Sequence, residues 1–96
     1  MNCVDSLKHE DFRWLVCHLR NHETTVKSPQ DVPRDVIADR NIFEAYLKLL
    51  ASEENITLTY NAAAGRSEII KIRVNKRIHI LAREAESYER DAEDSE

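Results

Sequence analysis

The spacing of the apolar residues changes once along the chain, and this change limits the possible folds more than any other feature of the sequence. Before Asn55, apolar residues recur every three to four positions, which is typical of amphipathic helices. After it, Ile56, Leu58 and Tyr60 alternate with threonines, which is typical of a half-buried strand. The sequence therefore predicts an α+β fold in which helices come first and strands follow.

Three helices are expected before the change of spacing. They run from Leu7 to about Glu23, from Pro29 to Val36, and from Arg40 to about Glu53. Residues 1–6 are expected to form a loosely ordered lead. Ser28 and Asp39 are suitable N-caps for the second and third helices, and a proline fits the first helical position after Ser28. A short extended link joins the first two helices.

Two strands are expected after Asn55. The second runs over residues 70–74, where Ile70, Ile72 and Val74 alternate with two basic residues, so one face is apolar and the other is basic. Residues 61–67 form the connecting loop, in which Gly65 can adopt a positive φ. The chain then either forms a short third strand over residues 78–80 or leaves the sheet.

A single long helix from Ser67 through Glu89 is the competing interpretation of this region, and the density of β-branched residues favours strands instead. Residues 82–89 have helical propensity but lack apolar support at their end. We expect disorder from about residue 88 onward. The domain prediction is a folded unit over residues 1–83 and a flexible acidic tail over residues 84–96.

Charge is distributed unevenly along the chain. The net charge of −4 combines a tail over residues 84–96, with seven acidic residues and one arginine, and a body with a net charge of +2. Within the body, residues 62–83 carry six basic residues and one acidic residue. A basic segment followed by an acidic tail is the feature with the most bearing on function, because binding depends on the local field of a patch.

Composition excludes several classes of protein. The 96 residues, 42 % of them apolar, suit one small domain, and two cysteines are too few for a disulfide framework, so we expect thiols in a reducing compartment, cytoplasmic or nuclear. No apolar run is long enough for a membrane span or signal peptide. With one glycine, no nucleophile elbow and no paired carboxylates, an enzyme is not expected, and neither is a cofactor. His18 and His22 share a helix face but lack further metal ligands, so no metal site is expected.

Residues 28–74, SPQDVPRDVIADRNIFEAYLKLLASEENITLTYNAAAGRSEIIKIRV, resemble a winged helix-turn-helix domain. Residues 29–36 match its short helix, residues 37–39 its turn, residues 40–52 its recognition helix, and residues 56–74 its wing. Residues 7–23 match the first helix. The resemblance implies a three-helix winged helix-turn-helix with a C-terminal β-hairpin wing and a disordered acidic tail. It also implies a small DNA-binding transcriptional regulator or accessory factor.

The candidate binding residues follow from this resemblance and from the chemistry of base recognition. Arginine pairs with guanine, asparagine with adenine, and glutamate accepts from cytosine, in a major groove that admits a helix. Basic residues of a wing contact phosphates or enter the minor groove. The candidates are Arg40, Asn41, Glu44 and Lys48 on the helix, Arg66 at the loop tip, and Lys71, Arg73, Lys76 and Arg77 after it. An ordinary solvated helix face explains the first four equally well.

Two features depart from the family pattern: the turn lacks a glycine, and Glu44 near the helix centre would be repelled by phosphate. A protein-interaction module on the same scaffold is therefore the alternative function, with the acidic tail binding a basic partner or mimicking nucleic acid. The tail could also fold back on the basic hairpin and weaken DNA binding. The expected partner is double-stranded DNA, with a homodimer or a partner protein to supply enough interface.

Overall fold

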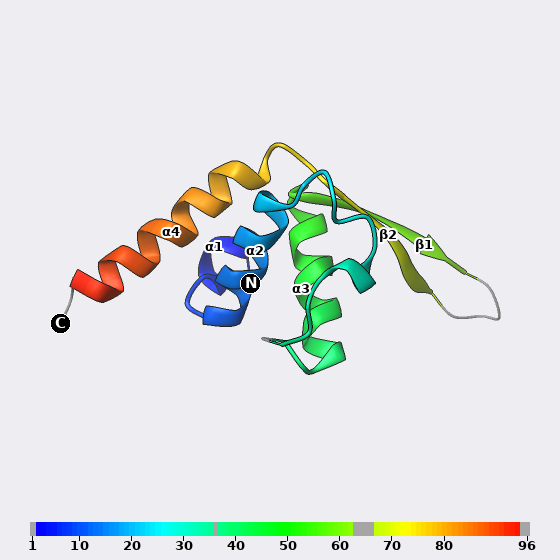
Figure 1. Ribbon diagram of the computed structural model, residues 1–96, viewed down its shortest axis with the longest axis horizontal. Helices are drawn as coiled ribbons and strands as arrows, with labels where there is room; N and C mark the ends of the chain where they lie inside the picture. The colour runs from blue at the N-terminus through cyan, green and yellow to red at the C-terminus, as the bar shows by residue number, and fades with distance from the viewer. Residues whose placement is uncertain (1, 36, 63–66, 95–96) are drawn as a thin grey trace.

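The computed structural model describes residues 2–35, 37–62 and 67–94. These residues form an α+β fold, as predicted. The elements in chain order are α1 (Cys3–Ser6), α2 (Glu10–Asn21), the 3-10 turn η1 (Pro29–Asp31), α3 (Arg40–Ser52), β1 (Ile56–Asn61), β2 (Glu68–Val74) and α4 (Ile78–Asp94). Figure 1 shows the β1–β2 hairpin at one end of the long axis and the free end of α4 at the other, with α2 and α3 between them.

The core lies where α2, α3, the base of the hairpin and the first half of α4 meet. Phe12 of α2 packs edge-on against Tyr46 of α3, with the ring centroids 5.0 Å apart. The Tyr46 hydroxyl donates to the Asp11 carboxylate at 2.9 Å, which ties the two helices together at the edge of the core. The largest fully buried side chains include Phe12, Phe43, Leu15, Leu19, Leu47, Leu50, Ile56, Ile72 and Ile78.

The third predicted helix is confirmed as α3. The Asp39 carboxylate accepts hydrogen bonds from the backbone N–H groups of Asn41 and Ile42, at 2.8 and 3.2 Å, so Asp39 is the N-cap. The helix ends at Ser52, and Glu54 takes a φ of 63°, which redirects the chain into β1. The Asn75 amide donates to the Glu54 carbonyl at 3.1 Å and so joins this corner to the base of the hairpin.

The hairpin contains a bulge that the sequence analysis did not anticipate. Thr59 pairs with Lys71, but the next pair is Tyr60 with Ile69, which leaves Ile70 as an extra residue in β2. Ile69 and Ile72 are buried, whereas Ile70 is 47 % exposed. The prediction that Ile70 belongs to the buried face is therefore wrong, because one inserted residue exchanges the faces of the strand before it.

The segment between α2 and η1 also contacts the sheet. The backbone N–H of Ile72 donates to the Lys27 carbonyl at 2.8 Å, on the side of β2 away from β1. Val26, beside it, is buried. The expected extended link thus lies alongside β2 and closes the core on that side.

Three predictions about the first half of the chain are wrong. The residues expected to be a loose lead form α1, capped by the Asn2 side chain, and the next helix begins at Glu10 rather than at Leu7. The helix expected from Pro29 to Val36 is only the turn η1. It stops because Val32 is extended before Pro33, and a residue before proline disfavours the helical conformation. Val36 itself lies outside the described residues.

The predictions for the last part of the chain also need correction. Residues 78–80 begin α4 rather than a third strand, and the single helix from residue 67 is wrong because residues 68–74 are strand. The helix expected over residues 82–89 is present, but it continues through Asp94, where disorder was predicted. The helix is ordered because Ile78, Leu81, Ala82 and Ala85 are buried in the core. Two arginines of α2 also form ion pairs with glutamates of α4.

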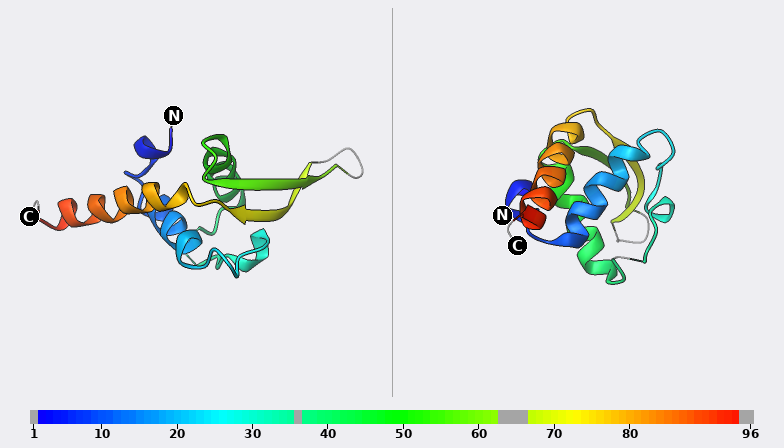
Figure 2. Two further views of the ribbon diagram at one scale, coloured as in Figure 1. Left: turned by 90° about the horizontal axis from the view of Figure 1, so that it is seen from above. Right: turned by 60° about the vertical axis from the view of Figure 1, so that its left-hand side comes forward.

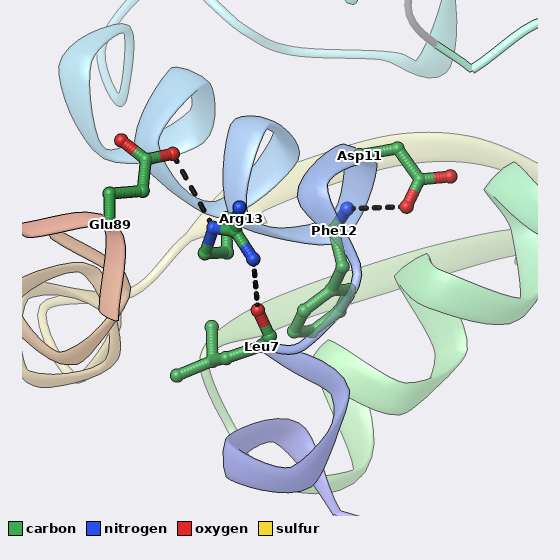
Figure 3. Close-up of polar contacts among 5 residues, drawn as sticks. All are labelled: Leu7, Asp11, Phe12, Arg13 and Glu89. Atoms are coloured by element: carbon green, nitrogen blue, oxygen red, sulfur yellow. Dashed lines mark hydrogen bonds and ion pairs between the residues drawn. The ribbon is translucent and has the colours of Figure 1, made fainter. Parts of the chain in front are cut away.

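Arg13 of α2 is the central polar residue of that contact. Its Nη1 donates to the Leu7 carbonyl at 2.7 Å, and its Nε lies 3.4 Å from a Glu89 carboxylate oxygen of α4, as Figure 3 shows. Its guanidinium also lies 4.8 Å from the centre of the Tyr88 ring. A second ion pair joins the same two helices: Arg20 of α2 pairs with Glu86, which lies one turn before Glu89 on α4.

In the described part of the chain, no helix has both the length and the apolar character that a membrane crossing requires.

Candidate nucleic-acid interface

The solvent-facing side of α3 is the first part of the candidate interface. Asn41, Ala45, Lys48 and Ser52 are spaced by three or four residues, so they lie in one line along the helix. All four are exposed, while the opposite side of α3 is buried in the core. A polar line with short side chains at two positions allows the helix backbone to approach a flat or grooved partner closely.

Arg40 and Glu44 lie on the flank of that line, facing the hairpin. The Arg40 Nε is 3.6 Å from a Glu44 carboxylate oxygen, an ion pair one turn apart. Together with Asn41, they line a groove of about 500 Å³ whose far wall is formed by Ser67 and Glu68 at the start of β2. The groove combines one cation with two carboxylates, so its charge is mixed rather than basic.

Arg34 was missed by the sequence analysis. It lies in the loop after η1 with its guanidinium 5.1 Å from the centre of the Phe43 ring, and it lines a small pocket together with Arg40. It therefore adds an exposed cation beside the N-terminal turn of α3. The only signal in the sequence was a basic residue in a proline-containing loop, which is too common to single out.

Lys71 and Arg73 form a second group, on the outer face of the hairpin. They alternate with the buried Ile72, so they share the face turned away from the core, opposite Thr59 and Thr57 of β1. Both are exposed, and neither has an ion pair within the described ranges. The prediction of a basic outer face on this strand is therefore confirmed, but that face is separate from the groove beside Arg40.

Lys76 and Arg77 form a third group, in the turn between β2 and α4. The Arg77 Nη1 lies 4.0 Å from a Glu54 carboxylate oxygen, just beyond the C-terminal end of α3. Arg40 is at the other end of that helix. Arg66 lies outside the described residues. The structure thus distributes the candidate residues over three places instead of gathering them in one patch.

The acidic part of the chain lies far from the basic hairpin. Glu86 and Glu89 pair with arginines of α2, and Figures 1 and 2 show α4 running away from the hairpin. The expected fold-back of the tail onto the hairpin is therefore wrong, because α2 offers these glutamates closer positive partners.

His18 and Cys3, whose side chains could indicate a catalytic or metal site, are packed against other residues of the fold. His18 stacks between Trp14 and His22, with ring centroids 5.0 and 4.4 Å away, and burial, followed by the charge of His22, lowers the pKa of His18. Burial, followed by the carboxylate of Glu53, raises the pKa of the Cys3 thiol to about 12, so it stays protonated at neutral pH. Among the described residues, no three potential metal ligands come together.

Comparison with known proteins finds no match to this chain among protein-family models, curated sequences or solved structures.

Proposed function

We propose that this protein is a small DNA-binding module of the winged-helix type, with α3 as the helix that enters the major groove. The order of elements supports the proposal: a helix, an extended link hydrogen-bonded to β2, a short turn, a second helix and a hairpin. The turn η1 and the loop after it stand where such a domain has its short middle helix, and they position the N-terminus of α3.

The outward line of α3 supplies the groups for base recognition. Asn41 can pair with adenine through its amide, and Lys48 can donate to guanine or to a phosphate. Ala45 and Ser52 between and beyond them are small enough to let the helix approach the bases. Arg40 sits at the edge of this line, where it reaches the sugar–phosphate backbone while still paired with Glu44.

The hairpin supplies the contacts with the phosphate backbone. It projects from the body of the molecule (Figure 1), and its outer face carries Lys71 and Arg73 between threonines. Lysine and arginine give affinity that depends on salt and not on sequence, and threonine hydroxyls add neutral hydrogen bonds to phosphates.

The observation that carries the proposal is the separation of charge between the two ends of the molecule. Lys48, Lys71 and Arg73 have no ion pair within the described part of the chain and lie on α3 and the hairpin, while the acidic run that begins at Glu84 lies on α4, which points the other way. A duplex approaching α3 and the hairpin therefore meets these cations and stays away from the acidic run that makes the chain's net charge −4.

A salt-titrated binding assay tests this proposal. The full chain is titrated against a fluorescent duplex, and the logarithm of the affinity is plotted against the logarithm of the salt concentration. The Lys71→Ala/Arg73→Ala double variant should flatten the slope by roughly two, because each lost phosphate contact removes about one unit. Lys48→Ala should flatten it by roughly one.

The control removes the same charge from the opposite end of the molecule. Arg83 and Arg90 are exposed on α4, and Arg83→Ala/Arg90→Ala should leave the slope unchanged. Equal effects of the two double variants, or no duplex binding at low salt, would overturn the proposal.

A protein-interaction module is the second candidate. The groove with Glu44 and Glu68 favours it, because two carboxylates repel phosphate. That function predicts no affinity for the duplex at low salt. It predicts binding to a lysine-rich peptide instead, lost on Glu44→Gln/Glu68→Gln, which removes the two carboxylates of the groove.

A further inference from the structure

Two strongly exposed apolar side chains meet at the junction of α1 and α4. Val4 is 54 % exposed and Ile80 is 65 % exposed. Together with Leu81 they line a hollow of about 330 Å³, which Glu53 and Asn55, between α3 and β1, also line. Neighbouring exposed aliphatic side chains often mark a surface that a partner covers.

Charged residues flank this apolar centre symmetrically. Arg77 precedes Ile80 by three residues and Glu84 follows it by four, and both line the same hollow. Within the described part of the chain, Glu84 has no ion pair and Arg77 has one, with the highly exposed Glu54 at 4.0 Å, while Glu53 lines the same hollow. The surface thus carries a positive group, an apolar centre and a negative group in a row along the helix.

We propose that a second copy of this chain covers this surface, with the two α4 helices antiparallel about a two-fold axis beside Ile80. In such an arrangement, a residue that precedes the axis by a given number of positions faces the residue of the other copy that follows the axis by the same number. The two Ile80 side chains then lie beside the axis, and Arg77 meets Glu84 of the other copy. Both ion pairs form at once, because the same patch is used twice.

The self-complementary order of charges selects a second copy over an unrelated partner. A partner of another kind would need no matching positive and negative groups at equal distances from the apolar centre. The dimer buries Val4 and Ile80. It does not rest on the proposed function, since its test contains no DNA.

Sedimentation equilibrium of the full chain, at concentrations up to roughly 500 μM because a small interface binds weakly, tests the proposal. The wild type should fit a monomer–dimer equilibrium. Ile80→Glu should weaken dimerisation by more than about tenfold, because it places a charge at the apolar centre. Ile70→Glu, the same change at the exposed residue of the hairpin bulge, should leave it unchanged.

Charge reversal gives a sharper test that does not depend on loss of an apolar contact. Arg77→Glu and Glu84→Arg each create two like-charge pairs across the axis, so each variant should dimerise roughly tenfold more weakly than the wild type. A mixture of the two variants should form heterodimers, since each copy then supplies the charge that the other needs. Circular dichroism checks that every variant is folded.

Three results would overturn the proposal. They are a monomeric wild type over the whole concentration range, equal dimerisation of the wild type and Ile80→Glu, and a mixture of the charge-reversed variants that associates no better than each alone.

Discussion

The two ends of the molecule use their charged residues in different ways. At the α2–α4 end, Arg13 and Arg20 each face a glutamate of α4, so their charges hold two helices together. At the hairpin end, Lys71 and Arg73 face threonines and solvent. The comparison shows that a count of charges says little about binding, because cations that are paired inside the fold are occupied and the others stay available to solvent.

The two ends also differ in what keeps them folded. The first half of α4 buries Ile78 and Leu81, whereas its second half attaches through Ala85 and ion pairs with α2. The hairpin attaches through large side chains, Ile69 and Ile72, on one face of β2. Stability should therefore depend on apolar volume at the hairpin and on polar contacts at the second half of α4.

The largest expected effect is at the hairpin. Ile72→Ala should lower the free energy of unfolding by about 3 kcal/mol, because it removes a buried aliphatic side chain and leaves a cavity. Ile70→Ala, two residues away, should lower it by less than about 0.5 kcal/mol, because that side chain is exposed at the bulge. Urea denaturation of both variants gives the comparison directly. Similar losses at the two positions would contradict the register and the bulge.

An intermediate effect is expected at the helical end. Arg13→Ala should lower the free energy of unfolding by about 2 kcal/mol, because it leaves the buried Leu7 carbonyl without a donor. Glu89→Gln should cost only about 0.5 kcal/mol, because it weakens an ion pair whose acidic partner is half exposed. If Glu89→Gln cost as much as Arg13→Ala, the ion pair and not the carbonyl contact would hold this end together.

The sequence predicted the elements whose signals are local. Asp39 before an amphipathic stretch predicted α3, and the alternation after Asn55 predicted β1. The bulge in β2 could not be predicted, because Ile69 and Ile70 are the same residue type and either can occupy the buried face. Pro33 carried the signal that would have shortened the second helix to η1, because a residue before proline disfavours the helical conformation.

The sequence could not predict the features that depend on distant partners. Residues from about 88 onward were expected to be disordered, because the residue that pairs with Glu89 is 76 positions away. The same limit applies to the candidate interface. Its residue types were chosen from the sequence, but whether they share a surface depends on packing, and of the candidates that the structure describes only Arg40, Asn41 and Glu44 line one groove.

The smallest expected effect is a loss of stability in mild acid that comes from the helical end alone. All four histidines lie outside residues 40–74, so the α3–hairpin region has none of the side chains that usually titrate between pH 5 and 7. Burial, and then the charge of His22, lowers the pKa of His18 in the folded protein below its ordinary value of 6.5. The unfolded chain therefore takes up a proton first as the pH falls, so the stability gained from neutral His18 is complete above pH 6.5 and is lost below it. His18→Gln should make the melting temperature less sensitive to pH between 7 and 5. The comparison variant is His79→Gln, which replaces a histidine of α4 that lies beside Glu23. An unchanged pH dependence in His18→Gln would show that another group controls the acid response of this end.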